Sequence, residues 1–425
     1  MKPSLVVIIA LGSLSIALAS TGSLASGLSD DPEDPQNLLV ENETRGGQRE
    51  SLFPASPLGW FHDFVDRGEK SLYDAVGLDV GFTVAQLYQW VSESEPHVDS
   101  WGVGTNADFI ARWDLFARDE PHQGKLFVHL QGRWDHGTLA PEELGTAALG
   151  SVIQTGNSYA PYESPEVIVR NLYWQMGSPE AGWAFRIGKI TPDATLATSA
   201  HLSTATTFLT AAGIGSFGIG HADSGIGFVG AWYPSDRVTL VGLVSDANAD
   251  RSDFGDIDEG DFFKAVQLNV KLWPRTEKAG YSKMTFWHTD GTKNRTAANG
   301  NTGQEGWGVF LKHEQELTDD GRAIGILKVG RSFENSAIYK QLAGVSFLLY
   351  DPPGPFGLQN DLLGAAFNWA QPTGLGSEYN VELFYRFPLF PLVDMTLSYQ
   401  SIIKPALDRD NGHASALSVR VRTTF

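Results

Sequence analysis

The sequence predicts an all-β fold, a transmembrane antiparallel β-barrel of about sixteen strands. Three observations support this prediction. The C-terminal block from Glu378 to Phe425 alternates apolar and polar residues, as strands with one apolar and one polar face do. Segments with the same alternation recur from Leu78 onward. The connections between them alternate between short and long, like the inner turns and outer loops of bacterial outer-membrane barrels.

The N-terminus has the pattern of a secretory signal peptide. A lysine precedes an apolar stretch from Leu5 to Leu18, and small residues follow it. We therefore expect residues 1–19 to be removed on export, with cleavage after Ala25 as the alternative. Residues 20–56 are acidic and rich in Pro and Gly, which predicts a disordered tether. Apolar side chains near helical spacing predict a short periplasmic helix within residues 57–77.

Residues 78–425 form the predicted barrel domain. They contain sixteen strand-like segments, an even number, as in single-chain bacterial barrels. The segments are residues 78–91, 104–117, 124–135, 165–176, 182–189, 225–233, 236–245, 261–273, 279–289, 305–316, 321–333, 340–350, 360–370, 377–387, 392–403 and 413–425. Beyond the N-terminus no stretch approaches the roughly 18 to 20 apolar residues of a membrane helix, so a helical membrane protein is excluded.

The connections provide a second, independent pattern. Short ones rich in Gly, Pro or Asp, as tight turns require, are RDEPHQG, MGSPEAG, YPSD, PRTEK, TDDG and PLFP. Between them lie long ones, Asp135–Ser164, Lys189–Ser224, Asp246–Gly260 and Asp290–Gln304. The alternation weakens late in the chain, where DPPGPFGLQ is a long inner turn and PTGLGS a short outer loop.

Charged residues occupy the polar rows of these strands. An Arg on the lipid face costs about 2 to 4 kcal/mol near the midplane, so the polar rows must face inward. Barrels of about 16 to 18 strands enclose an aqueous lumen. The residues predicted to line it are Arg112, Asp114, His129, Arg133, Asp135, Arg186, Glu378, Glu382, Arg386, Gln400, Arg420 and Arg422.

A set of landmarks in the C-terminal half carries a resemblance to a known family. They are Glu378, Glu382 and Tyr385 in the pattern E-x3-E-x-x-Y, then Pro391, Gln400, Pro405 and a final aromatic, Phe425. Upstream, Asp361 and Gly364 form a D-x-x-G strand, and RIGKITPDATLA has an Arg-x-Gly-(Lys/Arg) strand end. From about Leu72 to Phe425 the chain resembles the carbohydrate-selective, OprB-type porins of Gram-negative outer membranes. It departs from them at Leu397 and Ser398, where the family often has Pro-Asp.

The resemblance implies a passive channel in the cell outer membrane that admits mono- or oligosaccharides to the periplasm. The sequence contains no recognisable enzyme motif, so we expect no enzyme activity and no cofactor. Sugars are the expected transported solutes, outer-membrane lipid and lipopolysaccharide the expected surroundings, and a homotrimer is expected by analogy with porins. A general or ion-selective diffusion pore is the alternative within transport. An outer-membrane hydrolase or a surface adhesin is the alternative from another class.

The inward arginines suit contact with sugars, because the guanidinium group donates several directed hydrogen bonds and stays charged. The alternative is that inward ion pairs only brace the wall. In classical trimeric porins the position of Lys189–Ser224 holds a loop that folds into the lumen; a loop packed on the outer rim is the alternative. Candidate rings for stacking on sugars are Trp101, Tyr159, Tyr162, Phe208 and Phe217.

Other functional classes are disfavoured. The formal net charge of −19 repels nucleic acid, so no such partner is expected. The absence of Cys excludes disulfides and thiolate metal sites. The acidic loop Asp246–Asp261 has Arg251 and Ile257 where a calcium-binding EF-hand needs Gly and Glu, so we expect no metal site. His129, His201 and His288 have no Ser and carboxylate partners by spacing.

Overall fold

The computed structural model of the chain describes a defined set of residues. They are residues 51–53, 68, 71–92, 98–118, 120–159, 166–199, 201–214, 218–249, 254–255, 257–272, 279–296, 302–353, 358, 361–408, 410 and 412–424. The predicted signal peptide, most of the predicted tether and the terminal Phe425 lie outside these residues.

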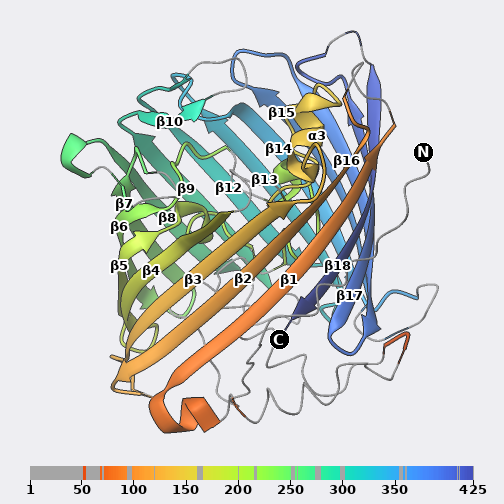
Figure 1. The fold of residues 1–425 in the computed structure, drawn as a ribbon. Helices are drawn as coiled ribbons and strands as arrows, with labels where there is room; N and C mark the ends of the chain where they lie inside the picture. The colour runs from red at the N-terminus through yellow and green to blue at the C-terminus, as the bar shows by residue number, and fades with distance from the viewer. Residues whose placement is uncertain are drawn as a thin grey trace.

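Sixteen antiparallel strands close into one barrel, which confirms the predicted fold class (Figure 1). They are β1 (Leu78–Val91), β2 (Trp101–Phe116), β3 (Gly124–Asp135), β4 (Glu166–Ser178), β5 (Trp183–Ile190), β6 (Gly225–Ser235), β7 (Val238–Asp246), β8 (Phe262–Leu272), β9 (Gly280–Thr289), β12 (Gly306–Glu316), β13 (Ala323–Ser332), β14 (Tyr339–Tyr350), β15 (Leu362–Pro372), β16 (Glu378–Phe390), β17 (Val393–Ile403) and β18 (His413–Thr424). Each barrel strand pairs with its neighbours in the chain, and β18 pairs with β1 to close the ring. All sixteen predicted segments correspond to barrel strands.

Smaller elements lie in the connections. β10 (Thr292–Thr296) and β11 (Thr302–Gly303) form a separate two-stranded sheet between β9 and β12. The β3–β4 connection contains α3 (Pro141–Ala147), and the β5–β6 connection contains η1 (Pro192–Ala194) and α4 (Ala211–Ile214). The β7–β8 connection contains η2 (Ile257–Glu259). Within the described residues, no helix is both long enough and apolar enough to cross a membrane.

The two faces of the wall differ in the way that the alternation predicts. On β16, Glu382 is buried, and the next residue, Leu383, is 50% exposed. The same contrast separates buried Gln267 from exposed Val266 on β8. The outer face is therefore apolar, and the polar rows point into the barrel. Such an arrangement suits a barrel with lipid outside and water inside.

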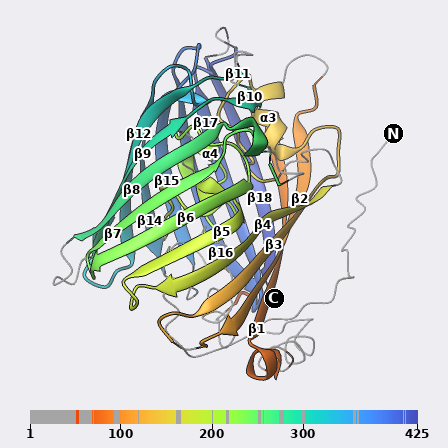
Figure 2. The same cartoon turned by 90° about the vertical axis from the view of Figure 1, so that its left-hand side faces the viewer.

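The β5–β6 connection lies inside the barrel. All four residues of α4 are buried, and α4 contacts the barrel strands β14 and β15. Figure 2 shows α4 within the outline of the barrel. The backbone of this loop is hydrogen-bonded to inward side chains of several strands, as described below. It is therefore not a loop packed on the outer rim.

The N-terminal part of the described chain contacts one end of the barrel. Residues 71–76 are helical, within the range predicted for a short helix. The N–H groups of Leu52 and Phe53 donate to the carbonyls of Pro388 and Leu389 at the end of β16, both at 3.0 Å. The ring of Phe53 lies 5.4 Å from that of Phe390. The described residues 51–53 of the predicted tether thus lie against the β16–β17 turn.

Gly364, one of the landmark residues, lies against an aromatic ring. It pairs directly with Phe384 on the neighbouring strand, and a Cβ added at Gly364 would overlap the ring of Phe384. That ring packs edge-on against Phe208 of the β5–β6 connection, with centroids 4.9 Å apart. Because this connection folds into the barrel, we call it the inner loop. The absence of a side chain at Gly364 therefore makes room for the packing of the loop.

We expect Gly364→Ala to lower the free energy of unfolding by about 1 to 3 kcal/mol, because the added methyl overpacks this contact. Urea titration of the protein refolded in lipid vesicles measures the effect. Gly242→Ala is the matched control, since nothing lies within 4 Å of a Cβ at Gly242. Equal stability of the two variants would contradict the packing role.

Candidate functional site

The twelve residues predicted to line the lumen all belong to the inward rows of the wall. Eleven of them are at most 5% exposed, and Asp135 is half-buried. The hydrogen-bond partners of these side chains differ from one part of the wall to another. Several of them bind the backbone of loops that fold into the barrel.

Glu378, at the start of β16, binds two different loops. Its carboxylate accepts hydrogen bonds from the Ser151 hydroxyl at 3.0 Å and from the N–H groups of Val152 and Ile153 at 3.3 and 2.9 Å. These three residues belong to the β3–β4 connection. It also accepts one from the N–H of Ala406, in the β17–β18 connection, at 3.0 Å. Glu378 therefore joins two outer loops to the wall.

Glu382, four residues further along β16, binds the inner loop. Its carboxylate accepts from the N–H groups of Leu209 and Thr210 at 2.8 and 3.0 Å. The Ser398 hydroxyl on β17 donates to it at 2.9 Å. Because side chains four residues apart on a strand share a face, one row of β16 holds both loop contacts.

Two of the predicted arginines also bind the inner loop. Arg420 on β18 donates to the carbonyls of Thr204 and Thr207 at 2.6 and 3.0 Å. Arg386 on β16 donates to the carbonyl of Thr206 at 3.1 Å. Glu382 thus binds N–H groups of the inner loop, and the two arginines bind carbonyl groups of the same loop.

Three lysines that the sequence prediction omitted form a row on neighbouring strands. Lys312 on β12 lies directly opposite Lys283 on β9 and Lys328 on β13. Lys283 donates to the Thr198 hydroxyl at 2.7 Å, and Lys328 donates to the Ala212 carbonyl. The alternation of apolar and polar residues in their strands places these lysines on the inward rows. The same pattern could therefore have identified them as lumen-facing residues.

Gln400, another landmark residue, holds the β3–β4 connection together with Gln89 of β1. Both side-chain amides donate to the carbonyl of Thr155, Gln400 at 2.7 Å and Gln89 at 3.0 Å. The Thr155 hydroxyl in turn donates to the Gln89 side chain at 2.7 Å. At the opposite end of the barrel, the landmark Tyr385 donates its hydroxyl proton to Asp361.

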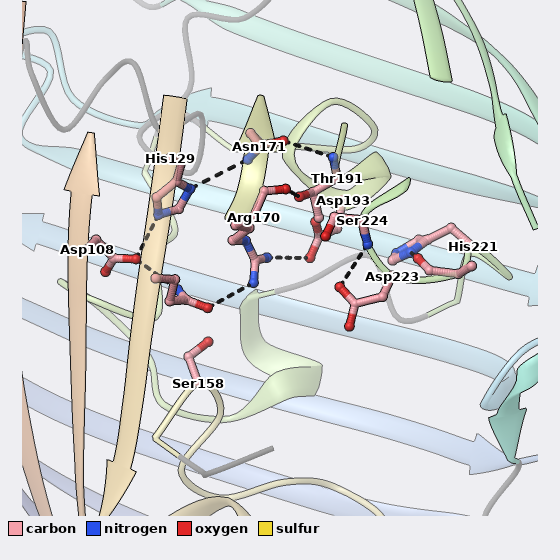
Figure 3. Close-up of polar contacts among 12 residues, drawn as sticks. Asp108, His129, Ser158, Arg170, Asn171, Thr191, Asp193, His221, Asp223 and Ser224 are labelled. Carbon is pink, nitrogen blue, oxygen red and sulfur yellow. Dashed lines mark hydrogen bonds and ion pairs between the residues drawn. The ribbon is translucent and has the colours of Figure 1, made fainter. Parts of the chain in front are cut away.

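A polar network covers the wall of β2, β3 and β4 (Figure 3). Asp108 contacts His129 Nε2 and accepts from the Gln131 amide, both at 2.8 Å. The other ring nitrogen of His129 lies 3.5 Å from the Asn171 amide nitrogen. Asn171 accepts from the N–H of Thr191 at 2.9 Å, which ties the start of the inner loop to this wall.

Arg170 joins this network because of a β-bulge. The register of β3 and β4 shifts between His129 and Leu130, which pair with Asn171 and Val169 respectively, so Arg170 is the extra residue. It lies 3.3 Å from the carboxylate of Asp193 in η1 and donates to Gln131 at 3.2 Å (Figure 3). Strict alternation of β4 does not place Arg170 inward, so the sequence prediction missed it.

The Arg170–Asp193 pair is more accessible than the ion pair that the predicted Arg112 forms with Asp79. The Arg170 and Asp193 side chains are 17% and 39% exposed, whereas Arg112 and its partner Asp79, 2.5 Å apart, are 3% and 4% exposed. Oδ1 of Asp193 is itself covered and has no hydrogen-bond partner in the structure, so the exposed part of this side chain does not include that oxygen. This pair thus places a guanidinium and a partly exposed carboxylate side chain where a small solute can reach them.

Ring faces lie near charged groups on the adjoining wall. Phe127 and Tyr173, directly paired on β3 and β4, stack with centroids 4.9 Å apart. The guanidinium of Arg186 lies 5.1 Å from the centre of the Tyr173 ring and donates to the Gln175 side chain at 3.0 Å. Cation–π contact and hydrogen bonding together fix the orientation of Arg186.

The predicted stacking rings have different surroundings. Trp101 is exposed at the rim, whereas Tyr159 and Phe208 are fully buried. Burial raises the pKa of the Tyr159 hydroxyl. Tyr162 and Phe217 lie outside the described residues. Of the three described rings, Trp101 is the exposed one, and it lies on the outward row of β2 with Phe109 and Trp113 and not on the row that faces the lumen.

The three histidines considered for catalysis have other partners. His129 contacts Asp108, His201 lies 3.1 Å from the Tyr350 hydroxyl, and His288 lies 3.4 Å from Asp290. Burial lowers the pKa of His201. The N–H of His201 donates to the Ser199 hydroxyl at 3.1 Å, but within the described chain none of the three imidazole rings is hydrogen-bonded to a Ser hydroxyl. The described residues also contain no group of three or more His, Asp or Glu side chains placed to hold a metal ion.

Comparisons with known proteins match the fold. No family model matches the sequence, and no curated protein does. The structure of Pseudomonas putida OprB at high pH is similar with a TM-score of 0.69 and 11% identity, over 89% of this chain and 99% of that chain. The low-pH structure of the same protein is similar with a TM-score of 0.50 and 9% identity, over 89% of this chain and 100% of that chain. The resemblance inferred from the sequence is thereby confirmed for the fold.

Proposed function

We propose that this protein is an outer-membrane porin through which carbohydrates diffuse passively into the periplasm. The observation that supports the proposal best is a closed sixteen-stranded barrel whose outer face is apolar and whose inner face is polar and charged. A barrel of this size is wide enough to enclose an aqueous path, and the inward loop narrows it.

The bilayer setting is supported by aromatic residues at both ends of the barrel. At one end, Trp90 of β1 and Trp101 of β2 are directly paired and both 45% exposed. At the other, Trp183 of β5 and Trp232 of β6 are paired and exposed. Such girdles mark the two membrane interfaces. Outer-membrane lipid and lipopolysaccharide are accordingly the proposed surroundings, with export by residues 1–19 and a homotrimeric assembly as parts of the same proposal.

Sugars are neutral polyols, so their passage needs hydrogen-bonding groups at an accessible place. The Arg170–Asp193 pair supplies guanidinium donors and a carboxylate on side chains that are 17% and 39% exposed. We assign the main solute contact to this pair. The more deeply buried Glu378, Glu382 and Arg420 bind loop backbone and would line the lumen without meeting the solute directly.

Osmotic swelling of liposomes that contain the refolded protein tests the proposal. We expect faster swelling in glucose than in an amino acid of the same size. Equal rates would reject the sugar preference and leave a general diffusion pore. The second candidate function is an ion-selective pore, which the charged inner wall favours. A strong reversal potential in a salt gradient, together with no block of the current by sugars, would support this candidate.

Replacing Asp193 by Asn or Arg170 by Gln should weaken the block of ion current by sugars about fivefold, because each removes hydrogen bonds worth about 1 kcal/mol. Current noise in planar bilayers measures this block. Arg322→Gln is the matched control, since Arg322 forms a similar pair with Asp320, at 2.6 Å, in a turn between strands. Unchanged block in the Arg170 and Asp193 variants would remove this pair from the solute path.

A further inference from the structure

We infer that Glu378 and Glu382 are positioning residues. They hold the β3–β4, β5–β6 and β17–β18 connections against the inner face of β16 and thereby set the cross-section of the channel. The inference rests on the proposed function, because it assigns the part of the protein that defines the width of that path. It gives the two carboxylates a role other than contact with the solute.

The two carboxylates lie where the three loops meet. Glu378 accepts four hydrogen bonds, three from the β3–β4 connection and one from the β17–β18 connection. Glu382 accepts three, two of them from backbone N–H groups of the β5–β6 connection. Five of the seven donors are backbone N–H groups, so the contacts fix the path of the loops rather than individual side chains.

The loops are also bonded to one another close to these anchors. The N–H of Asn157 donates to the carbonyl of Leu209 at 3.0 Å, and the N–H of Ala211 donates to that of Gln154 at 3.2 Å. The N–H of Leu407 donates to the carbonyl of Gly150 at 2.8 Å. If the loop bound to either carboxylate moves, the loop bonded to it therefore moves as well.

A carboxylate suits this task better than any neutral side chain. It only accepts hydrogen bonds, and its two oxygens have about four acceptor sites. Its bonds to N–H groups are charge-assisted and stronger than neutral ones. Loop N–H groups inside the barrel need partners, since buried backbone donors without a partner are rare. Glu378 and Glu382 satisfy five such donors and are themselves fully covered, at 0% exposure, so a passing solute does not reach them.

Asn380 is a natural control between the two anchors. It lies on the same inward row of β16 and is equally buried. Its side-chain oxygen accepts from Asn368 on the neighbouring strand at 3.3 Å, so this hydrogen bond is with the wall and not with a loop. A change at Asn380 tests whether any loss of polarity on this row alters the channel.

The test compares the full mature chain with Glu382→Gln, Glu378→Gln and Asn380→Ala in planar bilayers. Gln keeps the size of Glu but turns one acceptor into a donor that faces backbone N–H groups. We expect single-channel conductance and current noise to rise severalfold in both Gln variants, with larger oligosaccharides admitted in swelling assays. Asn380→Ala should match wild type. If one Gln variant does not fold, the other decides the test, because the two anchor different loops.

A second measurement does not depend on conduction. The chain has no Cys, so Ala212→Cys in α4, a fully buried position, introduces a unique thiol. Maleimide labelling should be slow in the Ala212→Cys protein and clearly faster when Glu382→Gln is added. Unchanged labelling and conductance, with weaker block by sugars, would overturn the anchoring role and make Glu382 a solute contact. No conductance in wild type would instead reject the proposed function, while the labelling would still test the anchor.

Discussion

Replacing the inner loop by a short linker should increase the conductance more than any point substitution. The replaced segment is residues 192–223 of the inner loop. The end of β5 and the start of β6 are adjacent, since Ile190 pairs with Gly225, so a linker of about four residues can join the two strands. The loop fills part of the lumen and contacts β8, β9, β13, β16 and β18 through hydrogen bonds. Its removal should open the path and abolish preference for sugars.

Single-channel recording and swelling assays measure this change. The matched control is the same replacement of residues 292–303, which carry the separate β10–β11 sheet. Near this segment the Lys264 amine contacts Asp290 at 2.6 Å, in a partly exposed ion pair at the rim. We expect the control to conduct as wild type does. Wild-type conductance in the variant that lacks the inner loop would mean that the loop does not narrow the path.

A charge on the outer face should destabilise the barrel according to depth. Leu383 lies in the middle of β16 and is 50% exposed, so Leu383→Arg places a guanidinium in the hydrocarbon region. The expected loss is about 2 to 4 kcal/mol of the free energy of unfolding. Urea unfolding from lipid vesicles measures it.

Val244→Arg is the matched control for this prediction. Val244 is 44% exposed and lies near the end of β7, where the strand reaches the membrane interface. There the same charge should cost only about 0 to 1 kcal/mol. An equal loss in both variants, or none at Leu383, would mean that lipid does not cover this face.

The strands and their faces follow from sequence because strand periodicity is local. The boundaries of β1 and β3 coincide with the predicted segments, and β2 starts at Trp101 rather than at residue 104. The late strands β14 to β18 pair in chain order even though the turn between β14 and β15 is long. Alternation of apolar and polar side chains specifies all of this without reference to distant residues.

The roles of the inward residues do not follow from local patterns. The bond between Glu378 and Ile153 joins residues 225 positions apart, and no periodicity in β16 encodes it. A hydrogen-bond partner in a loop depends on how that loop folds inside the barrel. Arg170 was missed for a different reason, since one extra residue in β4 reverses which side chains face inward. The landmark residues Glu378, Glu382 and Gln400 lie on inward rows, and each of them binds a loop.

Planar-bilayer recording of the refolded wild-type protein tests the central claim most directly. The account predicts discrete current steps in simple salt, reduced when sugar is added, because the polar inner face encloses water. The protein must first be shown to be folded and inserted, by its β-sheet circular dichroism and its resistance to protease in lipid. A folded, inserted barrel that passes no current would contradict the account and favour an adhesin that acts through its loops.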